Sequence, residues 1–230
     1  MMLFNKIKSL HTGLMGDFLA CLYATLMGVL LSLFAADQIS DYYERREMKT
    51  MMMLLVDELE FNTLKVHKMC DRVLLEKRAC RYLYNNRDNM DSVPKDSLDL
   101  YGGMQFSSLV LNFTTDAMET LKASGLITKV SDRKLTFDII KAYGSLNELN
   151  ISYRKYLDYK SYLKNTALGG LGENDVEEFT ASNWKSLVKK KYGLNVLRRL
   201  PNYQSSSLYI NKIKQLESAI EGIKRSYDLE

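Results

Sequence analysis

The sequence predicts an all-α protein, in which one N-terminal transmembrane helix continues into a long helix and is followed by a helical-bundle domain. The 230 residues include 2 Pro and 12 Gly, so few residues interrupt helices. No stretch alternates between apolar and polar residues for long enough to indicate a strand. The chain is 46% hydrophobic and 26% charged, a composition that is typical of folded proteins and excludes wholesale disorder.

The uncharged run Phe18–Ala36 predicts the membrane segment, which we place at residues 14–36. As a helix the run spans roughly 28 Å, close to the hydrocarbon thickness of a bilayer. A backbone in lipid must satisfy its own hydrogen bonds, which favours a transmembrane helix. A cleaved signal peptide is the second interpretation, but the run is long for one and has no A-x-A pattern at its end. A buried helix of a soluble protein is the third.

The preceding residues, 1–13, form a short cationic tail. Its apolar side chains fall on one helical face, away from Lys6 and Lys8, which is typical of a tail lying at a membrane surface. A solvated start to the helix fits equally well. The apolar residues are Met1, Leu3, Phe4, Ile7 and Leu10.

Small residues recur every four positions along the membrane segment. Four residues advance about 400°, so the row drifts slowly around one side of the helix. Because small residues let helix backbones approach closely in lipid, the row predicts a packing interface with a second copy or with another membrane protein. The interface comprises Gly16, Ala20, Ala24, Gly28 and Ser32.

Asp17 is an ionisable residue at the edge of this segment. Such residues are functional candidates because charge is unfavourable in lipid. At the start of a helix, a carboxylate also meets the positive end of the helix dipole. Asp17 therefore caps the helix at the interface or, in the alternative function, lines a small ion- or proton-conducting assembly.

Residues 37–85 contain neither Pro nor Gly and predict a continuing helix. Its apolar residues include an a/d seam, which fits a coiled-coil stalk or the first helix of a bundle. Additional apolar residues widen the stripe and favour the bundle. The seam comprises Met52, Val56, Leu59, Thr63, Val66, Cys70, Val73, Lys77, Cys80 and Tyr84.

Residues 86–230 predict an all-α soluble domain. A break rich in Asn, Asp, Ser and Gly covers 85–103, and SSLVLNF is expected to be a short helix or turn. Thr115 is expected to cap a helix that ends at Gly125, and Ser131 to cap the next one. Further helices are expected at about 175–192, 194–200 with a stop at Pro201, and from 206 onward.

Neither the composition nor the motifs indicate catalysis or a cofactor. The net charge of +4 is too balanced to predict nucleic-acid binding. His67 and Cys70 lack the further ligands of a zinc site, and the glycine loop at 169–174 lacks the Lys-Ser/Thr of a phosphate loop. The tyrosines that recur every three residues are expected to cover a core edge. They are Tyr153, Tyr156, Tyr159 and Tyr162.

Two blocks carry a resemblance to a known family. GDFLACLYATLMGVLLSLFAADQISDYYERRE and TTDAMETLKASGLITKVSDRKLTFDIIKAYGSL resemble a family of bacterial single-pass membrane proteins of unknown function. In the second block Thr115, Leu121, Ser124, Gly125 and Leu126 carry the likeness. The resemblance implies an N-terminus inside the cell and a C-terminal domain in the periplasm. The lysines and arginines flanking the segment do not favour either orientation.

Together these observations predict a membrane-anchored oligomeric interaction or scaffold protein, or a subunit of a bacterial inner-membrane complex. We expect no catalysis, no metal and no cofactor. The expected partners are membrane lipid and a second copy of the chain or another membrane protein, and no nucleic acid.

Overall fold

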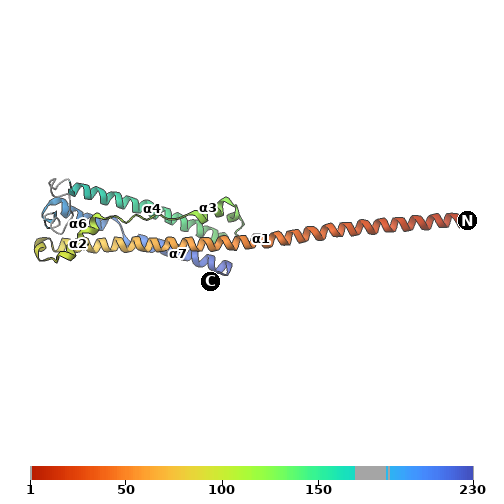
Figure 1. Ribbon diagram of the computed structural model, residues 1–230, viewed down its shortest axis with the longest axis horizontal. Coiled ribbons are helices and arrows are strands. Elements are labelled where there is room, and N and C mark those ends of the chain that lie inside the picture. Colours follow the sequence, from red (N-terminus) through yellow and green to blue (C-terminus); the bar gives the residue numbers. More distant parts are fainter. Residues whose placement is uncertain (1, 169–184, 186, 230) are drawn as a thin grey trace. The chain divides into compact units, whose positions relative to one another are not determined.

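The fold is known from a computed structural model, which describes the backbone of residues 2–168, 185 and 187–229. Side chains are described for these residues except 2–19, 105, 106, 167 and 168. All regular elements of the described residues are helical, which confirms the predicted all-α class (Figure 1). The α-helices are α1 (Met2–Asn85), α2 (Lys95–Phe106), α3 (Asp116–Ala123), α4 (Arg133–Leu168), α6 (Lys191–Tyr203) and α7 (Ser206–Tyr227), and 3₁₀ helices occupy Arg87–Ser92 and Leu126–Lys129.

The chain divides into two compact units, Met1–Met51 and Met52–Glu230. The first unit is the N-terminal part of α1. The second unit contains the remainder of α1 and all the other helices. The bundle therefore begins at Met52, and it includes most of the segment for which the sequence left stalk and first bundle helix open.

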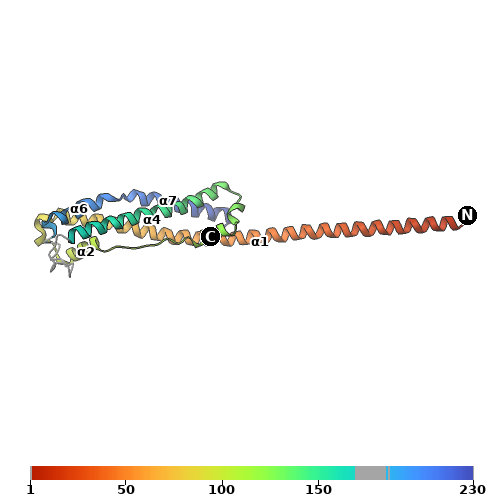
Figure 2. The ribbon, with the colours of Figure 1, turned by 90° about the horizontal axis from the view of Figure 1, so that it is seen from above.

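The second unit is built around α1, α4 and α7, which run side by side (Figures 1 and 2). Most of the seam predicted on α1 is buried inside this bundle, and its two remaining members, Lys77 and Tyr84, are half-buried. This burial accounts for the wide apolar stripe, because the helix packs on several elements of its own chain. The buried members are Met52, Val56, Leu59, Thr63, Val66, Cys70, Val73 and Cys80.

The end of α3 and the start of α4 are set by nearby residues, and the cap of α4 lies one residue later than predicted. Gly125 has φ +73°, a left-handed conformation that glycine adopts without strain, and it follows α3 as expected. The cap of α4 is Asp132 rather than Ser131, since Asp132 Oδ1 accepts from the main-chain nitrogens of Lys134 and Leu135. Asp132 thereby satisfies two of the unpaired N–H groups at the start of α4.

Three other expectations are corrected. Residues 95–103, placed in a break, belong to α2, which continues to Phe106, and SSLVLNF (107–113), expected to be a short helix or turn, is part of the extended segment Ser107–Thr115 (Figure 2). The helix expected at 175–192 is interrupted at Lys190, directly before the start of α6 at Lys191, and its earlier part lies mainly outside the described residues. Pro201 lies within the last turn of α6 rather than ending the helix before it.

Candidate functional site

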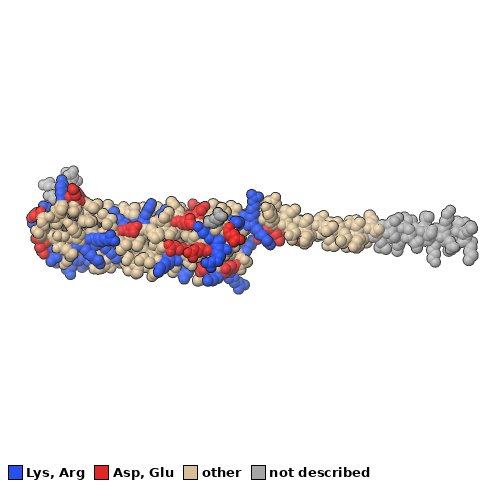
Figure 3. Space-filling view, turned by 90° about the horizontal axis from the view of Figure 1, so that it is seen from below, with Lys and Arg blue, Asp and Glu red and all other residues tan. Residues whose placement is uncertain are grey.

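The N-terminal part of α1 is long and apolar enough to cross a membrane. An 18-residue window within it has a mean hydropathy of 1.7, and none of that window is buried. Every side chain from Ala20 to Tyr43 is exposed. Residues 20–36 contain no Lys, Arg, Asp or Glu, and Figure 3 shows this uncharged stretch of α1, whereas both signs of charge cover the visible face of the bundle.

The predicted packing residues that the structure describes, Ala20, Ala24, Gly28 and Ser32, are all exposed in the single chain. A Cβ added to Gly28 would meet no atom within 4 Å. The Ser32 hydroxyl donates to the carbonyl oxygen of Gly28 over 2.8 Å, so its polar group is satisfied inside the helix, as lipid requires. The side chains of Gly16 and Asp17 lie outside the described residues, and the packing interface and the conducting role stay predictions.

Four side chains of α1 and α4 meet in the bundle core, and we call them the buried ion cluster: Arg72, Glu76, Tyr156 and Lys160. Glu76 and Lys160 have 2% and 3% of their surface exposed, and their closest oxygen and nitrogen are 2.5 Å apart. Arg72 Nε donates to the same Glu76 oxygen over 2.7 Å. The Tyr156 hydroxyl donates to the other oxygen. The cluster thus joins the two longest helices through one carboxylate.

The two cations of the cluster also bind main-chain oxygens at the end of α2. Lys160 Nζ donates to the carbonyl oxygens of Met104 and Ser107 over 2.9 and 2.6 Å. With Glu76, these oxygens occupy all three donors of the ammonium group. Arg72 donates to the same two carbonyls over 3.0 and 3.1 Å. The negative end of the α2 dipole favours both cations, so the cluster fixes α2 to α1 and α4.

Burial dominates the titration of this cluster. It lowers the pKa of Lys160, an effect that the charge of Glu76 and its hydrogen bond oppose. It raises the pKa of Tyr156, and the charge of Glu76 adds to that rise. Cys80, one turn after Glu76, has its pKa raised to about 12 by burial and then by Glu76. A neutral thiol and a neutral phenol are poor nucleophiles, so the cluster is suited to holding helices together.

A second set of contacts binds the extended segment Ser107–Thr115, which we call the strap. The side-chain amide of Asn62, which is fully buried, forms hydrogen bonds with both the nitrogen and the oxygen of Thr114. Lys65 Nζ donates to Asn112 O over 2.6 Å, and the Tyr153 hydroxyl donates to Leu109 O over 2.9 Å. These side chains pair with strap main-chain groups that have no strand partner, which explains how an extended segment packs on helices.

Glu58 of α1 caps the helix that follows the strap. Its Oε2 accepts from the main-chain nitrogen of Ala117 over 3.0 Å, and its Oε1 accepts from the Tyr143 hydroxyl over 2.5 Å. Thr115 precedes α3 but makes no side-chain bond to its main chain, contrary to the prediction. The cap of α3 is therefore supplied by α1. Because it is a carboxylate, the positive end of the α3 dipole also stabilises it.

Glu76 is a core residue that was not predicted, although its place in the sequence indicates burial. Glu76 occupies a core position of the stripe formed by Met69, Val73, Cys80 and Leu83. The tyrosine prediction is confirmed, since Tyr153 and Tyr156 are buried, Tyr159 is half-buried and Tyr162 is 63% exposed. His67 is exposed and Cys70 is buried, and the described residues hold no cluster of three or more metal ligands.

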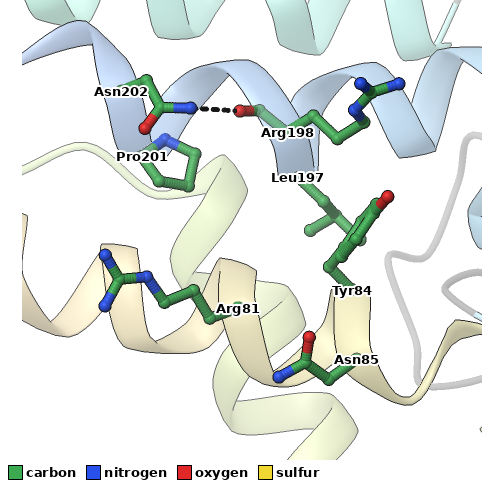
Figure 4. Close-up of a pocket in the computed structure, with 7 residues that line it drawn as sticks. All are labelled: Arg81, Tyr84, Asn85, Leu197, Arg198, Pro201 and Asn202. Carbon is green, nitrogen blue, oxygen red and sulfur yellow. Dashed lines mark hydrogen bonds between the residues drawn. The ribbon is translucent and has the colours of Figure 1, made fainter.

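The end of α1 and the C-terminal half of α6 border a cleft of about 260 Å³, which we call the α1–α6 cleft (Figure 4). Tyr84 of α1 and Leu197 and Pro201 of α6 point toward the space between the helices, and the side chains of Arg81 and Arg198 extend in opposite directions. The lining residues are Arg81, Tyr84, Asn85, Leu197, Arg198, Pro201 and Asn202.

No protein-family model, curated protein or solved structure matches the chain.

Proposed function

We propose that the protein is a membrane-anchored interaction or scaffold protein of a bacterial inner membrane, which works as an oligomer or as a subunit of a larger complex. The observation that carries the proposal is an exposed, uncharged stretch of α1 in the same chain as an all-α unit with its own core. The cytoplasmic N-terminus and periplasmic bundle are proposed on the family resemblance.

We propose no catalytic role because the ionisable groups of the bundle are engaged in structural contacts. The strongest cluster of ionisable groups, around Glu76 and Lys160, is buried. Its donors and acceptors are engaged with one another and with main-chain carbonyls. Such a cluster supports a rigid surface for partners better than it supports turnover of a substrate.

Membrane anchorage is tested by fractionating bacterial cells that express the full chain. The chain should stay in the membrane pellet after a carbonate wash. Replacing both Leu26 and Leu30 with Asp should release it, because each carboxylate in the segment opposes insertion by about 3 kcal/mol. The matched control is the pair Phe137→Asp and Ile140→Asp on the exposed face of α4. Release of the unaltered chain by carbonate would contradict the proposal.

Orientation is tested with an exposed cysteine. Ser161→Cys on α4, in a chain with Cys21→Ala, should react with an impermeant maleimide in intact cells whose outer membrane has been opened. Cys70 and Cys80 are buried and should not react with the maleimide. Labelling that requires lysis would place the bundle in the cytoplasm.

Self-association is tested at the row of small residues. Gly28→Leu should reduce crosslinking and lower the mass in detergent, because a large side chain keeps two backbones apart. Leu26→Ala, off the row, is the control. An unchanged mass in Gly28→Leu would exclude this face as the interface.

A further inference from the structure

The α1–α6 cleft combines an apolar floor with a polar rim. Tyr84 of α1 faces Leu197 and Pro201 of α6 across it. The rim carries one arginine and one asparagine from each helix: Arg81 and Asn85 from α1, and Arg198 and Asn202 from α6. A floor of this size accepts one or two apolar side chains rather than a large ligand.

None of the described residues that line the cleft is acidic. Among the residues that the structure describes, neither Arg81 nor Arg198 makes an ion pair. Lys77, one turn before Arg81 on α1, adds to the positive charge. Its pKa is lowered by burial and then by the charge of Arg81, as expected where cations are close together.

The directions of the two arginines restrict what fits. In Figure 4 their side chains extend away from each other, so one compact anion does not meet both guanidinium groups. An elongated ligand with an anionic group at each end and an apolar middle can contact both guanidinium groups. The asparagine side chains offer both donors and acceptors, which suits a peptide main chain.

We propose that the α1–α6 cleft binds an acidic segment of a partner protein, in which one or two apolar side chains lie between flanking carboxylates. The apolar side chains cover Tyr84, Leu197 and Pro201. The flanking carboxylates pair with Arg81 and Arg198, whose planar guanidinium groups bind carboxylates in a bidentate manner. The inference rests on the proposed interaction function and names the chemistry of one partner surface.

The test measures binding of three fluorescent peptides to the full chain in detergent by anisotropy. The first has the core Asp-Glu-Leu-Leu-Asp-Glu, the second replaces both leucines with serine, and the third replaces the acids with lysine. We expect the first to bind, the second to bind at least about tenfold more weakly because it does not cover the floor, and the third not to bind. Binding of the first should weaken as salt rises.

Two exposed arginines supply the variants. Arg81→Gln and Arg198→Gln should each weaken binding of the leucine peptide at least about tenfold. The matched control Arg154→Gln removes the same charge from an exposed position of α4 and should leave affinity within about twofold. Circular dichroism of each variant checks that the fold is retained.

Equal losses in all three variants would show general charge attraction and overturn the assignment, as would equal binding of the leucine and serine peptides or no binding of the leucine peptide. These results are distinguishable from a failure of the proposed function. Membrane fractionation and crosslinking do not depend on the cleft, and peptide binding does not depend on the membrane segment.

Discussion

The side-chain amide of Asn62 pairs with the main chain of Thr114 in both directions, its Nδ2 donating to Thr114 O over 2.7 Å and its Oδ1 accepting from Thr114 N over 3.0 Å. A side chain on a helix here replaces the neighbouring strand that an extended segment otherwise needs. The pair lies near the end of the strap and is separated from the buried ion cluster by the contacts of Lys65 and Tyr153. The strap is thereby fixed at both ends.

Asn62→Ala should lower the free energy of unfolding by about 2–3 kcal/mol, because it leaves two main-chain groups of Thr114 without their partner in a largely buried place. Urea unfolding of the full chain in detergent, followed by circular dichroism, measures the change. Asn147→Ala on the exposed face of α4 is the control and should change stability by less than about 0.5 kcal/mol. Similar effects of the two changes would show that the pair with Thr114 contributes little.

Glu76→Leu should lower the free energy of unfolding by about 3–5 kcal/mol, because Lys160 and Arg72 lose the only carboxylate that the cluster contains. Combining it with Lys160→Met should lower stability by much less than the sum of the two single changes. The same denaturation assay gives the coupling energy. Additive effects would contradict the assignment of Glu76 and Lys160 to one coupled cluster.

Stability should fall as pH rises above about 9–10. Burial raises the pKa of Cys80 from 9.0 to about 12 and that of Tyr153 from 10.0 to about 12. The folded chain therefore keeps these protons where the unfolded chain has lost them, and the stabilisation is complete below the unfolded pKa values and is lost toward pH 12. Lys160, whose pKa is lowered, acts in the opposite direction.

A tyrosine pair gives the matched test of this pH dependence. Tyr153→Phe should reduce the slope between pH 10.5 and 11.5 by about 1.4 kcal/mol per pH unit, the contribution of one proton. Tyr162→Phe, at an exposed position, should leave the slope unchanged. The slopes come from urea denaturation at several pH values. A slope that both variants share with the unaltered chain would assign the effect to other groups.

Two glycines should respond to alanine in opposite ways. A Cβ at Gly193 of α6 would lie 2.1 Å from the carbonyl oxygen of Leu187, so Gly193→Ala should destabilise the bundle by about 2–3 kcal/mol. A Cβ at Gly144 of α4 would meet nothing within 4 Å, so Gly144→Ala should stabilise the helix by about 0.5–1 kcal/mol. Thermal unfolding of the full chain compares them, and a loss of stability in Gly144→Ala would contradict the open environment.

The helices with long apolar periodicity were predictable from sequence, whereas the strap and its anchors were not. The seam on α1 predicts the end of that helix near Tyr84, and the helix ends at Asn85. The strap residues Ser108–Leu111 carry no extended signal, because their conformation depends on side chains far away in the chain. In the sequence, Asn62 and Lys65 look like ordinary polar residues of a helix. Only the fold brings them to Thr114 and Asn112.

The buried ion cluster was predictable in part. Glu76 lies in the apolar stripe of one helix, and Lys160 lies between Tyr156 and Leu163 in the stripe of another. Charged residues of opposite sign at two such core positions indicate a buried ion pair. The carbonyls of Met104 and Ser107 were not predictable, because sequence does not report where one helix ends against another. The α1–α6 cleft has no sequence signature either, since its lining comes from two distant segments.

The burial of α1 against α7 has a consequence for the order in which the chain is made. The partner of Glu60 is Lys224, near the end of α7, and Ile220 and Ile223 of α7 are buried in the core. Ribosomal synthesis of the intervening chain lasts on the order of ten seconds. During that time the apolar seam of α1 has emerged without the helix that covers it. The core of the bundle is thus completed only after α7 has been synthesised, and a nascent chain stalled before α7 is expected to be a substrate for chaperones and proteases.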